Sequence, residues 1–118
     1  MSAGNSSRRR QIATLNDRFR STMDNRLGQV MLTAGVADLP SDVLAVLIRK
    51  VARFDGFDNE LNDPYGEHDF GAISIAGQKF FWKIDCYQKG TDGLSGAETP
   101  DDPTTTDRVL TVMLAEDY

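Results

Sequence analysis

The stretch Phe70–Tyr87, FGAISIAGQKFFWKIDCY, decides the fold because its pattern is that of a β-hairpin. Two apolar segments, 70–76 and 79–87, are separated by a short break around Gly77 and Gln78, which is typical of a hairpin turn. Alternate positions of the second segment are apolar, namely Phe80, Trp82, Ile84 and Cys86. Because successive side chains of a strand point to opposite faces, we predict that these four residues face the core.

The intervening positions of the second segment place Phe81 and Tyr87 on the other face of the strand, beside Lys83. Large aromatic side chains are usually covered, so one interpretation packs them beneath the second helix described below. The alternative is a contact patch, because Tyr and Phe are enriched at protein interfaces.

Two further strands and two helices are predicted outward from the hairpin. Residues 29–34 and 106–116 are short apolar segments, and the second is apolar on nearly both faces, as in a central strand. Apolar residues recur at helical spacing over 8–23, and the stretch 41–54 follows a helix-start signal at Pro40. Three cations, Arg49, Lys50 and Arg53, form the solvent-facing end of that second helix.

This order of elements predicts an α+β fold, with two helices packed on a mostly antiparallel sheet of about four strands. The chain of 118 residues suits a single domain. We expect residues 1–10 to form a flexible, polar and basic N-terminus and residues 11–118 to form the domain.

Several functional classes are disfavoured by composition. No apolar run approaches the roughly 20 residues that span a bilayer. A single cysteine and the lack of a signal-peptide pattern favour a cytoplasmic protein. The sequence contains no phosphate-binding loop, nucleophile elbow or dinucleotide fingerprint. We therefore predict no catalytic residue and no cofactor.

The net charge of −5 conceals an uneven distribution along the chain. Residues 1–54 hold nine Lys/Arg and four Asp/Glu, a net charge of +5, whereas residues 55–118 hold four and fourteen, a net charge of −10. The acidic residues of two predicted loops are candidates for contact with a partner: Asp55, Asp58, Glu60, Asp63, Glu67, Asp69, Asp92, Glu98, Asp101 and Asp102.

The one histidine lies among carboxylates, which permits a metal-binding interpretation. Its candidate ligands are His68, Asp63, Glu67 and Asp69. Their spacing matches no established metal motif, and one imidazole leaves a zinc site short of nitrogen and sulfur ligands. The structural alternative is that His68 and Asp63 hydrogen-bond their own loop and fix the entrance to the hairpin.

Three segments together resemble a known family: Asn62–Gly71 (NDPYGEHDFG), Phe81–Tyr87 (FWKIDCY) and Arg108–Tyr118 (RVLTVMLAEDY). The chain is similar to the bacterial family called domain of unknown function 3768, found mainly in alphaproteobacteria and often on plasmids or other mobile elements. Relatives usually have Lys-Ile-Asp-Tyr-Tyr where this chain has Cys86, which argues against an essential thiol. The resemblance implies no reaction, but accessory proteins of mobile elements often block host defence or regulatory complexes.

Our leading hypothesis is a small, non-enzymatic interaction protein whose acidic surface docks on a basic protein. We expect it to act as a mobile-element-encoded inhibitor of a host nucleic-acid-binding or defence complex, of the anti-CRISPR or anti-restriction type. The alternative is a metal-binding module or metal-dependent enzyme centred on His68. Contact with nucleic acid is expected only through the basic residues of the first helix: Arg8, Arg9, Arg10, Arg18 and Arg20.

Overall fold

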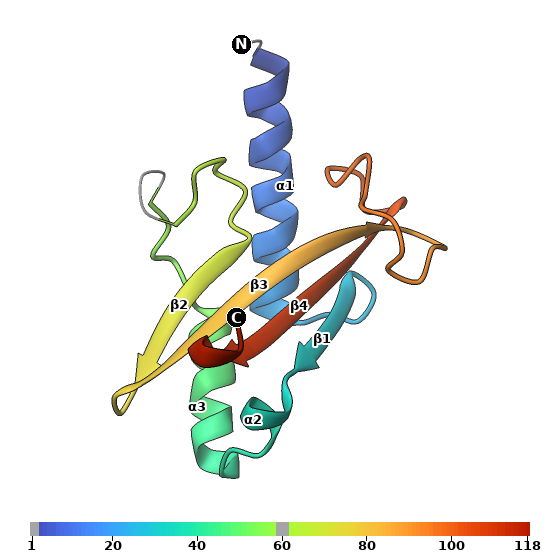
Figure 1. Ribbon diagram of the computed structural model, residues 1–118. Coiled ribbons are helices and arrows are strands. Elements are labelled where there is room, and N and C mark those ends of the chain that lie inside the picture. The colour runs from blue at the N-terminus through green and yellow to red at the C-terminus, as the bar shows by residue number, and fades with distance from the viewer. Residues whose placement is uncertain (1–2, 59–61) are drawn as a thin grey trace.

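The computed structural model describes residues 3–58 and 62–118, and their elements form two layers (Figure 1). One layer is a four-stranded sheet with the strand order β1-β4-β3-β2. Its strands are β1 Gly28–Leu32, β2 Phe70–Ile75, β3 Gln78–Gln88 and β4 Thr106–Leu114. The pairs β2–β3 and β3–β4 are antiparallel, whereas β1 runs parallel to β4. The predicted α+β class and mostly antiparallel sheet are confirmed.

The helical layer consists mainly of α1, Ala3–Thr22, and α3, Ser41–Ala52, which are the two predicted helices. A short helix α2, Ala34–Ala37, and a final 3-10 turn η1, Ala115–Asp117, were not predicted. No helix within residues 3–58 and 62–118 is long and apolar enough to cross a membrane.

Helix α1 begins five residues earlier than the predicted start at Arg8. It therefore includes most of the segment 1–10, which the sequence indicated to be loose. Arg8 forms an ion pair with Asp101 and also donates a hydrogen bond to the Glu98 carbonyl. These partners are about ninety positions away in the chain, so the composition of the N-terminus alone does not reveal them.

The core lies between the two long helices and one face of the sheet. Phe80, Trp82 and Ile84 are buried there, as the alternating pattern predicted, and Cys86 is half-buried at the end of the same row. Phe19 of α1 and Leu47 of α3 are fully buried against this face. Burial of each such side chain is worth about 1.5–3 kcal/mol, so the packing orients both helices.

The opposite face of the sheet carries Phe81, and the prediction that this ring packs beneath the second helix is wrong. Phe81 lies 5.3 Å from the Tyr118 ring and 5.1 Å from the Phe70 ring, centroid to centroid. The C-terminal residue thus covers Phe81, because α1 and α3 both pack on the core face. Tyr87 instead lines a shallow hollow with Met31 and Val109.

Gly71 permits a close approach that brings the end of α3 against the sheet. A Cβ atom at this position would lie 2.5 Å from Trp82 Nε1 and 2.7 Å from Phe54 Cζ. These separations are too short for a real side chain, so only glycine allows both rings to lie over β2. Phe54 lies two residues after the end of α3 and is thereby fixed beside the strand.

Candidate functional site

Two loops rich in acidic residues flank the N-terminal part of α1 (Figure 1). One joins α3 to β2 and the other joins β3 to β4, and both lie at the same end of the molecule. The basic and acidic halves of the sequence therefore do not form two separate surfaces. The ion pair between Arg8 Nε and Asp101 Oδ1, at 3.1 Å, is one place where they meet.

A cleft lies between α1 and the two loops. It consists of adjoining hollows of about 200 and 300 Å³, which share Ile12, Glu67 and Pro100. The smaller hollow has three carboxylates among its lining residues, and we call it the carboxylate cleft: Ile12, Asn16, Glu67, Asp69, Ile84, Asp85, Cys86 and Pro100. The larger hollow adds Arg8, Arg9 and Ala97.

The carboxylate cleft disfavours the charged forms of two of its acids. Burial raises the pKa of Glu67, and the negative charge of Asp69 raises it further. Burial also raises the pKa of Asp69, with smaller contributions from the charges of Asp63 and Asp85. Arg9 and Arg8 partly offset the effect at Glu67. A positive group placed in the cleft would relieve this mutual repulsion.

We expect the protein to lose stability as these two carboxyls ionise. Their pKa values are higher in the folded chain than in the unfolded chain, so the folded state binds more protons between the two values. The free energy of unfolding should therefore fall as the pH rises above about 4. Glu67→Gln and Asp69→Asn should each raise the free energy of unfolding at pH 7 and change it little near pH 3.5, as measured by urea unfolding.

A suitable control is Asp24→Asn, because the Arg26 side chain lowers the pKa of Asp24 to about 2. This variant should change stability at pH 7 in the opposite direction. Equal stabilisation by all three substitutions would contradict the role assigned to the cleft.

Two buried polar side chains form the support of the cleft. Arg108 Nε donates to Asn16 Oδ1 at 2.8 Å, and Asn16 Nδ2 donates to the Glu67 carbonyl at 2.9 Å. Arg108 also donates through Nη2 to the Pro100 carbonyl. Arg108 is 2% exposed and Asn16 1% exposed. This chain of hydrogen bonds joins α1, β4 and both acidic loops.

His68 lies beside the cleft and is held by two aspartates. Its Nδ1 is 2.9 Å from Asp17 Oδ2, and its Nε2 is 3.7 Å from Asp63 Oδ2. The imidazole stacks on Phe57 with a centroid distance of 3.9 Å and an interplanar angle of 2°. These contacts fasten the loop before β2 onto α1.

Asp63 is a correction to the predicted acidic surface, because the structure buries it to 2% exposure. Its Oδ1 accepts the His68 backbone N–H at 3.0 Å, and its carbonyl accepts the Gly66 N–H. The turn has positive φ values at Gly66 and His68, and these bonds hold it in that conformation. The structural alternative is thus found for Asp63, which bonds its own loop, whereas the ring of His68 bonds Asp17 of α1 instead.

The metal-binding alternative required His68, Asp63, Glu67 and Asp69 to converge. Glu67 and Asp69 line the carboxylate cleft, whereas His68 and Asp63 do not. Across residues 3–58 and 62–118, no group of three or more His, Cys, Asp or Glu side chains is arranged to hold a metal ion. Metal binding by these residues stays a prediction from the sequence.

The remaining predicted acidic residues have different surroundings. Asp101 is paired with Arg8, and Asp102 accepts bonds from the backbone and hydroxyl of Thr104. Asp55 lines a different pocket, beside α3. Glu60 lies outside the described residues. Three of the predicted acids are exposed, namely Asp58, Asp92 and Glu98. Asp92 lines the hollow that contains Tyr87.

Arg20 is a correction to the predicted basic face of the first helix, because its side chain is buried. It donates from Nε to the Val51 carbonyl at 3.0 Å and from Nη2 to the Phe54 carbonyl at 2.9 Å. Arg20 and Asn16 follow Ile12 in steps of four residues, which places all three on one face of α1. That spacing is the signal that could have identified both buried polar residues.

The other predicted basic residues of α1 are more accessible. Arg8, Arg10 and Arg18 are exposed, and half-buried Arg9 lies over the Tyr65 ring at 5.4 Å.

The fold and the cleft define a small two-layer α+β domain with a carboxylate-lined hollow beside its first helix. The chain belongs to the family described as "Protein of unknown function (DUF3768)", whose model matches residues 32–117. The chain matches no curated protein and no solved structure. The matched region contains Glu67, Asp69 and Arg108 of the cleft but not α1.

Proposed function

We propose that this protein is a non-enzymatic interaction module that docks the end carrying the carboxylate cleft onto a basic protein surface. The observation that supports this proposal best is the cleft itself, where Glu67 and Asp69 are half-buried beside Asp85. Their raised pKa values mean that water solvates their charges poorly. A lysine or arginine side chain from a partner would replace this missing solvation with a charge-assisted hydrogen bond.

The position of the acidic loops supports docking over an area larger than the cleft. Exposed Asp58 belongs to one loop, and exposed Glu98, whose carbonyl accepts a hydrogen bond from Arg8, belongs to the other. They extend the negative charge on both sides of α1, and complementary charge of this kind accelerates association and orients the partner. The attraction should weaken as salt screens exposed charges.

A basic protein surface is frequently one that binds nucleic acid, because phosphate contacts depend on lysine and arginine. Occupation of that surface by the acidic loops would exclude the nucleic acid by competition. This is how an inhibitor of a host defence or restriction complex would act. We include that role in the proposal, with a partner defined by its basic nucleic-acid-binding surface.

The proposal is tested by affinity capture with purified protein immobilised and challenged with bacterial lysate. The double variant Glu67→Gln/Asp69→Asn removes two charges inside the cleft. The control Asp38→Asn/Glu116→Gln removes two exposed charges elsewhere. We expect wild type and control to retain the same basic proteins at 50 mM salt and to release them at 500 mM salt.

The cleft variant should retain at least tenfold less of these basic proteins than the wild type does. Added duplex DNA should compete with the wild type for binding to the same basic proteins. Failure of the wild type to retain any basic protein at low salt would contradict the proposal. Equal retention by the cleft variant would show that the cleft does not contact the partner.

A further inference from the structure

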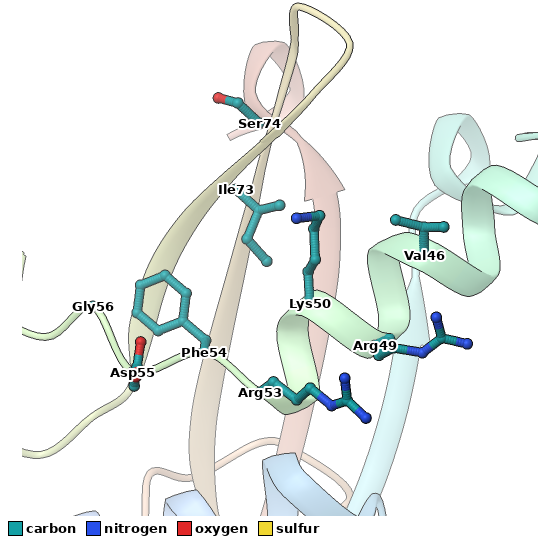
Figure 2. A pocket seen from close by; sticks show the side chains of 9 residues that line it. All are labelled: Val46, Arg49, Lys50, Arg53, Phe54, Asp55, Gly56, Ile73 and Ser74. Atoms are coloured by element: carbon teal, nitrogen blue, oxygen red, sulfur yellow. The ribbon is translucent and has the colours of Figure 1, made fainter.

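A second pocket, of about 620 Å³, lies between the end of α3 and the strand β2 (Figure 2). Three cations line it, namely Arg49 and Lys50 of α3 and Arg53 directly after the helix. Val46, Phe54 and Ile73 provide apolar surface, and Asp55 is the one carboxylate among the lining residues. In Figure 2, Lys50 points toward the β2 side of the pocket, and the two arginines point away from it.

The side chains of these three cations are not used for polar contacts within the described part of the chain. All three are exposed, and within the described residues none forms an ion pair or a side-chain hydrogen bond. Cations often stabilise the last turn of a helix by approaching its free carbonyls. Here Arg20 of α1 already binds the carbonyls of Val51 and Phe54.

The other wall of this pocket is the edge of the sheet. β2 pairs only with β3 among the described strands, so its outer edge is open. The Ile84 N–H donates to the Asp69 carbonyl. In an antiparallel pair, every second residue of a strand directs its backbone N–H and C=O to the neighbouring strand, and the residues between direct theirs away from it. The backbone groups of Phe70, Ala72 and Ser74 therefore point to the open edge. Ala72 and Ser74 are small and exposed, so their side chains leave that edge accessible.

We propose that this pocket binds an acidic, extended peptide segment of a partner protein, which adds to the sheet as a strand beside β2. Backbone hydrogen bonds to Ala72 and Ser74 would align the segment, as in other cases of strand addition. Every second side chain of the added strand would point to the helix side. Acidic side chains at those positions would meet Lys50 and the rim formed by Arg49 and Arg53.

The charge of the pocket favours such a peptide over a second copy of this chain. Pairing of two β2 edges would bring two sets of these three cations toward each other, and like charges repel. Nucleic acid would use the same cations but has no counterpart for the open backbone groups of β2. The unpaired strand edge is therefore the feature that selects an extended polypeptide.

The proposal is tested with a capped octapeptide of alternating Glu and Thr, titrated into the full chain at low salt and followed by amide NMR. We expect the largest shifts at the amides of Ala72 and Ser74. Lys50→Gln/Arg53→Gln should weaken binding at least tenfold. The control Arg10→Gln/Arg18→Gln removes two exposed cations from α1 and should leave the affinity within twofold of wild type.

Two further peptides separate strand addition from simple charge attraction. The same octapeptide with N-methyl groups on alternate amides keeps its charge but cannot pair as a strand, and we expect it to bind at least tenfold more weakly. A Gln–Thr octapeptide should not bind detectably. Equal binding of the methylated peptide would overturn the proposal. So would the absence of octapeptide binding, tighter binding of single-stranded DNA at the same residues, or dimerisation through β2.

Discussion

Replacing Arg20 with methionine is expected to lower the free energy of unfolding by about 3 kcal/mol. The change leaves the Phe54 carbonyl without its side-chain donor and leaves the Val51 carbonyl only the 3.2 Å bond from the Phe54 N–H. A buried acceptor that loses its donor costs about 1–3 kcal/mol. The guanidinium also lies 5.0 Å from the Trp82 ring and 5.3 Å from the Phe57 ring, contacts worth about 0.5–2 kcal/mol together.

Urea unfolding, followed by the fluorescence of the single tryptophan Trp82, measures this loss. Arg20→Lys keeps the positive charge, but an ammonium group lacks the planar set of donors with which the guanidinium reaches both carbonyls. This variant should therefore recover only part of the stability lost in Arg20→Met. The exposed neighbour Arg18→Met provides the matched control. A value for Arg20→Met within 0.5 kcal/mol of this control would contradict the role of Arg20 as the link between α1 and α3.

Replacing Arg108 with methionine should lower the free energy of unfolding by about 2–4 kcal/mol, because it leaves two acceptors unpaired. These acceptors are Asn16 Oδ1 and the Pro100 carbonyl. The loop that contains Pro100 should also exchange its amide hydrogens faster. We further expect weaker capture of basic proteins, since the cleft loses the contact that joins its two sides.

A double-mutant cycle tests the geometry of Arg108 directly. Arg108→Met and Asn16→Ala should be non-additive by about 1 kcal/mol or more, because the two side chains share a hydrogen bond. Arg108→Met and Arg20→Met have no common partner and should add within about 0.5 kcal/mol. Additive behaviour of the first pair would rule out the proposed support of the cleft.

Most of the fold was predictable because local patterns specify it. Alternating apolar positions identified the buried row Phe80, Trp82 and Ile84, and helical spacing identified α1 and α3. The continuous apolar character of 106–116 indicated a central strand, which β4 is. The short helix α2 was missed because four residues carry no helical period. The position of Tyr118 over Phe81 was missed because it depends on residues that are distant in the sequence meeting in space.

The candidate site was less predictable, because the burial and hydrogen bonds of its polar side chains depend on how segments pack together in the fold. Arg20 and Asp63 were expected on the surface, but Arg20 is buried against carbonyls at the end of α3, and Asp63 is buried in the turn of its own loop. Asn16 and Arg108 were not identified at all, since their hydrogen bond joins residues 92 positions apart. Glu67 and Asp69 were identified as acidic residues, but only the packing of α1 against both loops encloses them in a cleft.

The most direct test of the proposed function is an NMR titration of the full chain with a capped peptide of alternating Arg and Gly at low salt. The account predicts shifts concentrated at Glu67, Asp69 and residues 97–101, and at least tenfold weaker binding by Glu67→Gln/Asp69→Asn. The charge-matched control Asp38→Asn/Glu116→Gln should bind like wild type. Shifts spread evenly over exposed acids, with equal affinity for both variants, would contradict the assignment of this cleft as the docking site.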